Sequence, residues 1–197
     1  AELLAQLPTP GEVELETIAS ADWAVDRSGL VNLAHPAAEA AGLQDGDEPI
    51  RIFFHVIRHP TQGTFIVDTG VETALRDAPE RSAVSGLVRS AMHLEKLKVK
   101  APLGEWVTKE KLAGVFLTHL HVDHVTGMRD VPNDVPVYTG PGEAAATGLM
   151  SAIVRSTTDR ALEGKAPLRE WQFRNDESGQ FDGVLDVFGD GSVWALW

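Results

Sequence analysis

The stretch Thr-His-Leu-His-Val-Asp-His at residues 118–124 decides which fold this sequence encodes. It places three of the chain's seven histidines and one carboxylate within six residues. Since His119 and His121 are two residues apart, an extended backbone would project both imidazoles to the same side. Asp123 and His124 follow at the point where we expect a helix to begin. A transition from strand to loop to helix can therefore direct all four side chains into one cleft.

Neutral imidazole and carboxylate groups are ligands that zinc accepts, at about 2.0–2.2 Å. Four such ligands so close together indicate two adjacent metal ions, because paired metals can polarise one carbonyl or phosphoryl oxygen together. The alternative is that these are polar residues of a surface loop, which suits isolated histidines better than this ordered set. The sequence contains no cysteine, so disulfides, thiolate nucleophiles and cysteine-type zinc sites are excluded.

Length and charge limit the remaining possibilities. The 197 residues suit a single domain over residues 1–197, in which we expect residues 1–12 to form an extended arm. The net charge of −12 should repel phosphate backbones, so we expect no nucleic-acid partner. No apolar run is long enough to span a bilayer, so we expect no membrane partner. The chain begins at Ala1 without a signal-like segment, which favours a mature exported protein, with a cytoplasmic one as the alternative.

Hydrophobic patterns predict alternating strands and helices, and therefore an α/β (or α+β) class. The patterns indicate a strand at 13–18, a loop with short helical turns at 19–48, and a hairpin formed by 50–57 and 64–67. Apolar spacing favours an amphipathic helix at 82–97. The later elements are predicted as strands at 114–118, 135–138, 171–173, 184–188 and 193–197, and as helices from 123 or 124 to about 130 and from 141 to about 157.

The histidine stretch resembles the His-x-His-x-Asp-His signature of the metallo-β-lactamase superfamily. The upstream Phe-Ile-Val-Asp-Thr-Gly at residues 65–70 resembles the first motif of that family, a strand that ends in an aspartate beside the metal loop. The two motifs occur in the family's order, and a helical segment separates them. The resemblance covers about residues 50–197 and implies the N-terminal part of an αβ/βα sandwich.

By this resemblance, His119 and His121 would bind a first zinc ion, and Asp123 and His124 a second. Asp68 would orient the ligand loop from behind. Other divalent metals would suit the same ligands. The resemblance implies a soluble hydrolase in which a metal-bound hydroxide attacks an ester, lactone, amide or thioester of a small molecule, and in which Asp123 also carries a proton. We favour a lactonase-like activity because the helical insertion between Asp68 and His119 is long.

The sequence departs from the family pattern after His124, where no further histidine occurs. The family needs a third histidine for the first site, and a bridging aspartate with another histidine for the second. Asp190 is a candidate for the bridge, but its setting in Phe-Gly-Asp-Gly-Ser is typical of a hairpin turn. The apolar strand at 193–197 stops abruptly, so we expect these residues to belong to a longer enzyme. We expect the missing C-terminal portion to associate with them, and a homo-oligomer is also compatible.

Two alternative functions follow from these departures. The first is a catalytically incomplete chain that binds metal only weakly, or only together with its missing portion. The second rests on Asp68-Thr69-Gly70, which also resembles the active-site loop of aspartic proteases. That activity would need a second aspartate about 3 Å from Asp68, and it would leave the histidine stretch unexplained.

Overall fold

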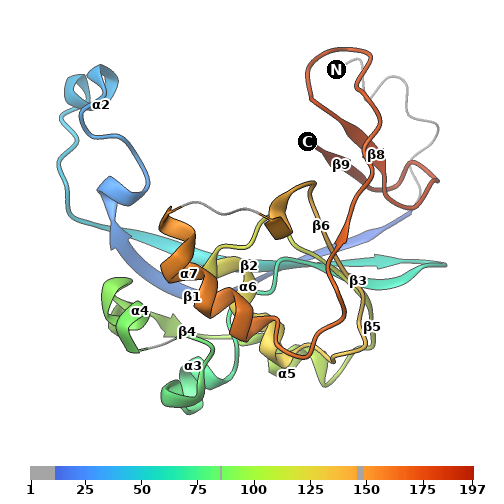
Figure 1. Ribbon diagram of the computed structural model, residues 1–197, viewed down its shortest axis with the longest axis horizontal. Coiled ribbons are helices and arrows are strands. Elements are labelled where there is room, and N and C mark those ends of the chain that lie inside the picture. The colour runs from blue at the N-terminus through green and yellow to red at the C-terminus, as the bar shows by residue number, and fades with distance from the viewer. Residues whose placement is uncertain (1–11, 85, 146–148) are drawn as a thin grey trace.

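The computed structural model describes residues 12–84, 86–145 and 149–197 of the chain, with side chains left aside for 149–154. The arm predicted at residues 1–12 falls almost entirely outside this range. The described part consists of a seven-stranded mixed sheet, helices on one of its faces, and a separate two-stranded hairpin (Figure 1). This mixture of parallel strands and helices confirms the predicted α/β class.

The large sheet has the strand order β4-β1-β2-β3-β5-β6-β7. Strands β4, β1, β2 and β3 pair antiparallel, and β3, β5, β6 and β7 pair parallel. The parallel half is the half that matters for function, because the carboxyl ends of β3 and β5 lie side by side there. The strands are β1 (Glu14–Asp26), β2 (Asp47–His59), β3 (Gly63–Val67), β4 (Lys98–Val99), β5 (Leu112–Phe116), β6 (Val137–Thr139) and β7 (Arg169–Glu170).

The first strand is more than twice as long as predicted. β1 continues from Glu14 to Asp26, through residues that we expected to form a loop, and it pairs with β2 along its whole length except for a bulge between Ala19 and Ala21. The alanine-rich sequence at 19–24 has little β propensity of its own, so pairing with β2 decides its conformation. Beyond the strands, η1 (Arg27–Gly29) and α2 (Pro36–Ala40) lie on an arm that projects from the sheet (Figure 1).

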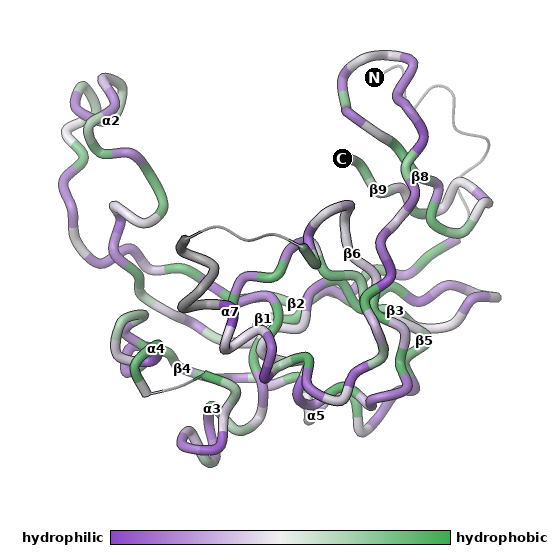
Figure 2. Tube along the Cα trace, viewed as in Figure 1, coloured by the Kyte–Doolittle hydropathy of each residue, from purple (hydrophilic) through white to green (hydrophobic). Residues whose placement is uncertain are grey.

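The predicted hairpin is confirmed: β2 and β3 pair antiparallel, with His59 opposite Gly63. Alternate residues of these strands face opposite sides of the sheet. Phe54 and Ile66 point to the side that carries α5 (Leu103–Val107), α6 (Val122–Val125), η4 (Thr126–Asp130) and α7 (Leu149–Ala161), where the main core lies. Apolar residues recur along β3 and β5 in Figure 2, whereas the loop that carries α3 (Ala74–Asp77) is largely hydrophilic.

The segment between β3 and β5 does not form the long helix predicted at 82–97. It contains α3 (Ala74–Asp77), η2 (Pro79–Arg81), α4 (Gly86–Ala91) and η3 (Leu94–Lys96) instead. His93, between α4 and η3, interrupts the helical course with a left-handed φ of 51°, and the Trp23 indole donates a hydrogen bond to its carbonyl oxygen at 3.4 Å. Leu87, one of the apolar residues whose spacing predicted that helix, is 76% exposed. The helix predicted from residue 141 consists of η5 (Glu143–Ala145) and, after the undescribed residues 146–148, α7.

The hairpin β8 (Val184–Asp186) and β9 (Trp194–Leu196) covers part of the other face of the large sheet. Its flanking Phe188 contacts Phe65 and Phe116, with ring centroids 4.9 and 6.2 Å away. The hairpin confirms the predicted strand pair near the end of the chain. The strand predicted at 171–173 is displaced, since β7 ends at Glu170.

Candidate metal centre

The histidine stretch lies where the sequence analysis places it, between the end of β5 and the start of α6. β5 ends at Phe116, and residues 117–121 continue without helix or strand. His121 precedes the first turn of α6, and its carbonyl oxygen accepts hydrogen bonds from the backbone N–H groups of His124 and Val125 at 3.0 and 3.1 Å. The predicted strand-to-loop-to-helix transition is therefore present, although the helix continues as the 3-10 segment η4.

The three imidazoles of the stretch form one cluster. The ring centroid of His119 lies 4.4 Å from that of His121 and 4.1 Å from that of His124. His119 and His124 are half-buried, whereas His121 is exposed. Burial lowers the pKa of His119, and the neighbouring His124 and His121 lower it further, so its ring favours the neutral form that a metal requires.

Asp68 lies beneath this cluster, at the end of β3. Its Oδ1 accepts hydrogen bonds from the backbone N–H and hydroxyl of Thr118, both at 2.9 Å, and its Oδ2 lies 2.7 Å from Nδ1 of His124. The side chain is almost fully buried, and the backbone has a left-handed φ of 54° that a short polar side chain tolerates. Asp68 therefore links the β3 loop to both ends of the histidine stretch.

Backbone contacts reinforce this link. The N–H and hydroxyl of Thr69 both donate to the carbonyl oxygen of His124, at 3.0 and 2.7 Å. Gly127 passes so close to this loop that a Cβ there would lie 2.0 Å from the carbonyl oxygen of Thr69. The position accepts only glycine without movement of one of the two segments.

Asp123 and His124 are paired through their side chains, with Oδ2 of Asp123 3.3 Å from Nε2 of His124. Burial works against the charge on His124, but its contacts with Asp123 and Asp68 prevail and raise its pKa to about 10. Burial also opposes the charge on Asp123 and on its own would raise the pKa of that carboxyl group. The hydrogen bond with His124 prevails and lowers this pKa. The metal-free pair is therefore charged, and a metal at Nε2 would replace a proton there.

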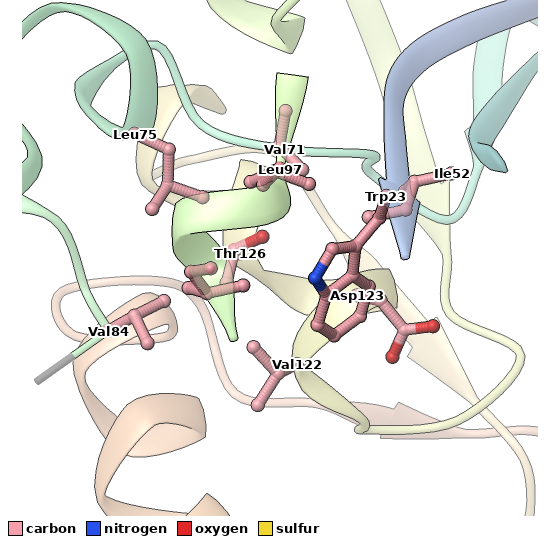
Figure 3. Close-up of a pocket in the computed structure, with 10 residues that line it drawn as sticks. Trp23, Ile52, Val71, Leu75, Val84, Leu97, Val122, Asp123 and Thr126 are labelled. Carbon is pink, nitrogen blue, oxygen red and sulfur yellow. The ribbon is translucent and has the colours of Figure 1, made fainter. Parts of the chain in front are cut away.

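An apolar pocket lies behind Asp123. Figure 3 shows the Asp123 side chain beside the Trp23 ring, with its carboxylate directed away from the aliphatic side chains of Leu75 and Val84. These apolar walls come from β1 and from the insertion between β3 and β5. They shield one side of Asp123 and leave its carboxylate to face His124. The pocket is lined by Trp23, Ile52, Val71, Leu75, Val84, Leu94, Leu97, Val122, Asp123 and Thr126.

A family model of the metallo-β-lactamase superfamily matches residues 47–192, the part of the chain that holds this site. The chain belongs to the metallo-β-lactamase superfamily. A search of curated proteins finds no match.

Solved structures with this superfamily's fold are similar to the chain. A quorum-quenching N-acyl homoserine lactone lactonase has a TM-score of 0.55 and 15% identity, with 92% of this chain and 61% of that one covered. A probable metal-dependent hydrolase from Staphylococcus aureus has a TM-score of 0.57 and 12% identity, with 86% and 63% covered. B. thuringiensis AiiA, with N-decanoyl-L-homoserine bound at its active site, has a TM-score of 0.53 and 15% identity, with 86% and 63% covered. The chain thus spans about three fifths of these structures, and the likeness shows the fold alone.

The donor set of this superfamily member fits a metal in part. Two ligands of a tetrahedral ion with bonds of about 2.0 Å lie roughly 3.3 Å apart, which is the distance between Asp123 Oδ2 and His124 Nε2. His119 and His121 lie beside this pair. Across residues 12–84, 86–145 and 149–197, no three His, Cys, Asp or Glu side chains converge as a metal requires. The described residues therefore offer a metal ion two paired donors, with two further imidazoles beside them.

Sequence reasoning missed two residues that hold the histidine stretch from outside. Oε1 of Glu143 accepts the backbone N–H of Leu120 at 2.8 Å, and the Thr158 hydroxyl donates to the carbonyl oxygen of Leu120 at 3.1 Å. They lie 23 and 38 residues beyond Leu120, so no local pattern marks them. Thr118 stands inside the stretch, but the sequence alone does not indicate that it contacts Asp68.

The structure also places the two aspartates on which the other sequence interpretations rest, Asp190 and Asp68. Asp190 lies in the turn between β8 and β9, where its Oδ1 accepts from the Ser192 backbone and its Oδ2 lies 2.7 Å from Nε2 of His59. Asp68 directs both carboxylate oxygens at Thr118 and His124. An aspartic-protease role would need a second carboxylate in their place.

Proposed function

We propose that the protein is a zinc-dependent hydrolase that opens a lactone, with esters, thioesters and amides as the wider class of substrates. His119, His121, Asp123 and His124 would hold the metal, with two ions in the complete enzyme. The observation that carries this proposal is the 3.3 Å pairing of Asp123 Oδ2 with His124 Nε2, while Asp68 holds the other ring nitrogen of His124. That arrangement would let one donor from each side chain bind the same ion.

A bound zinc ion would supply Lewis acidity towards a carbonyl oxygen and would acidify water. Asp68 acts on the ligand loop, because its contact with Nδ1 leaves Nε2 of His124 as the nitrogen that faces Asp123. Asp123, whose carboxylate pairs with His124, would hold or transfer a proton when the ester bond breaks. Rotation of the His119 and His121 side chains, whose ring centroids lie 4.4 Å apart, would bring two further donors towards a metal beside this pair.

The substrate class rests on charge and on the relatives. A net charge of −12 disfavours polyphosphate substrates. Solved relatives include a lactonase of N-acyl homoserine lactones and a hydrolase with N-hexanoyl-L-homoserine bound at its catalytic metal centre, a structure with a TM-score of 0.51 and 13% identity. The described part of the chain contains no helix that is long and apolar enough to cross a membrane.

A second candidate is the catalytically incomplete chain. It is favoured by the absence of a converging third donor among the described residues. On this proposal the chain would bind zinc weakly through Asp123 and His124 and would hydrolyse nothing without additional ligands.

The two candidates separate in one assay. Ring opening of N-hexanoyl homoserine lactone would be followed by pH-stat with zinc, after EDTA, and after zinc is restored. The hydrolase proposal predicts hydrolysis that EDTA abolishes, that zinc restores, and that His119→Ala removes. His35→Ala is the matched control, because this histidine caps α2 on the projecting arm. No zinc-dependent hydrolysis by the unsubstituted chain would leave the incomplete-chain candidate in place.

A further inference from the structure

The backbone between His119 and His121 is held on both sides by side chains from distant parts of the chain. Glu143, in η5, accepts the Leu120 N–H at 2.8 Å, and Thr158, in α7, donates to the Leu120 carbonyl oxygen at 3.1 Å. We propose that Glu143 and Thr158 are positioning residues that hold the backbone from which the two imidazoles project. The inference rests on the proposed function only in taking these imidazoles as metal ligands.

The two hydrogen bonds act on two different peptide units. The N–H of Leu120 belongs to the peptide that joins it to His119, and its carbonyl belongs to the peptide that joins it to His121. Because each peptide unit is planar, a hydrogen bond to one of its atoms restrains the tilt of the whole plane. Glu143 and Thr158 therefore restrain one of the two peptide planes that set the Cα–Cβ direction of His119 and one of the two that set that of His121.

Secondary structure does not hold this short segment. β5 ends at Phe116 and α6 begins at Val122, so His119 and Leu120 lie in neither. Asp68 holds Thr118 on one side and His124 on the other. Glu143 and Thr158 hold the backbone at Leu120, between those two residues.

The chemistry of the two contacts suits a rigid hold. A carboxylate that accepts a backbone N–H makes a charge-assisted hydrogen bond, which is stronger than a neutral one. The Thr158 side chain is largely buried, at 7% residue exposure, so water competes little for its hydroxyl. Leu120 packs against the main core, so the segment is fixed from its side chain as well.

The chain offers matched variants for a test. Glu143→Ala and Thr158→Val remove the two contacts, whereas Glu143→Gln and Thr158→Ser retain an oxygen that can make them. Thr157→Val is the control, because the neighbouring Thr157 hydroxyl is also buried but has no hydrogen-bond partner among the described residues. It changes the same helix in the same way without touching Leu120.

The first measurement uses the metal-free chain and nuclear magnetic resonance. Glu143→Ala should speed amide hydrogen exchange at Leu120 on the order of tenfold or more. Both Glu143→Ala and Thr158→Val should shift the imidazole resonances of His119 and His121. The conservative variants and Thr157→Val should leave exchange and ring resonances near those of the unsubstituted chain. If amide hydrogen exchange at Leu120 and the imidazole resonances are unchanged in both Glu143→Ala and Thr158→Val, the proposal is overturned, whether or not the protein binds zinc.

The second measurement is zinc affinity, from competition with a chromophoric chelator. Glu143→Ala and Thr158→Val should each weaken zinc binding about 10- to 100-fold, and Glu143→Gln and Thr158→Ser should recover most of the loss. An equal loss in Thr157→Val would overturn the proposal, because it would assign the effect to the helix as a whole. If the unsubstituted chain binds no zinc but the resonances shift as expected, the proposed function fails and the positioning role stands.

Discussion

Oδ2 of Asp68 lies 2.7 Å from Nδ1 of His124, and this contact ties the end of β3 to the first turn of α6. The same carboxylate accepts the backbone N–H of Thr118 at 2.9 Å. One buried side chain thus holds the segment on both sides of the histidine cluster. The parallel pairing of β3 and β5 makes this possible, because it brings their carboxyl ends to the same edge of the sheet.

The substitution Asp68→Asn tests this hold. Asparagine also tolerates a left-handed backbone, so the loop keeps its course while the charge on the oxygen that faces His124 is lost. We expect zinc affinity to fall about 10- to 100-fold, with the thermal midpoint much less affected. Competition with a chromophoric zinc chelator measures the first quantity, and differential scanning calorimetry the second. Zinc affinity equal to that of the unsubstituted chain would show that Asp68 does not orient a ligand.

A second prediction concerns the close approach of Gly127 to Thr69. In Gly127→Ala, the new Cβ would lie 2.0 Å from the Thr69 carbonyl oxygen, so one backbone segment must move. We expect the free energy of unfolding to fall by about 1–3 kcal/mol or more, as in other overpacked sites, and zinc binding to weaken because Thr69 contacts His124.

Urea unfolding of Gly127→Ala and Gly29→Ala gives the comparison. A Cβ at Gly29 meets nothing within 4 Å, so this control should stay within about 0.5 kcal/mol of the unsubstituted chain. Equal stability of the two variants would mean that the Gly127 contact is not as close as described.

The third prediction is a pH dependence that comes from Glu72. Its side chain is almost fully buried and accepts the Ala83 N–H at 2.7 Å. Burial, with a smaller effect of the nearby Asp130 charge, raises its pKa from 4.5 to about 7. Between these values the folded chain binds a proton that the unfolded chain has released. The stability that Glu72 contributes is therefore complete below pH 4.5 and is lost as the pH rises through 7.

The expected loss is about 3 kcal/mol, at roughly 1.4 kcal/mol per pKa unit. Glu72→Gln cannot ionise and should remove this part of the pH dependence. Urea unfolding at pH 4.5, 6 and 8 would measure it, with Glu177→Gln, at an exposed position, as the control. The explanation fails if the unsubstituted chain and Glu72→Gln lose the same stability between pH 4.5 and 8.

Local sequence was sufficient where one short segment determines its own structure. The β-branched runs in β2 and β3, with the turn between them, predicted the hairpin, and the histidine stretch predicted the bend from β5 into α6. Apolar spacing at 82–97 predicted a single helix, but Val84, Val88 and Leu94 pack against Val122 from separate short turns. Periodicity cannot detect this outcome, because the partner surface determines where each turn ends.

The candidate metal centre shows the same limit of prediction from local sequence. The sequence supplied the four candidate ligands, and Asp68 entered only by resemblance. Glu143 and Thr158 could not be predicted, because the fold alone brings them to Leu120 from 23 and 38 residues away. Contacts of this kind become visible only when the parallel strands and α7 are placed in space.

The most direct test of the central claim is zinc K-edge X-ray absorption on the chain loaded with one equivalent of zinc. We predict a first shell of nitrogen and oxygen only, at about 2.0–2.1 Å, with outer-shell scattering from imidazole. This scattering should weaken when His119 and His121 are both replaced by alanine. Zinc that dialyses away from the unsubstituted chain, or the same imidazole scattering in the double variant, would contradict the assignment of these residues as metal ligands.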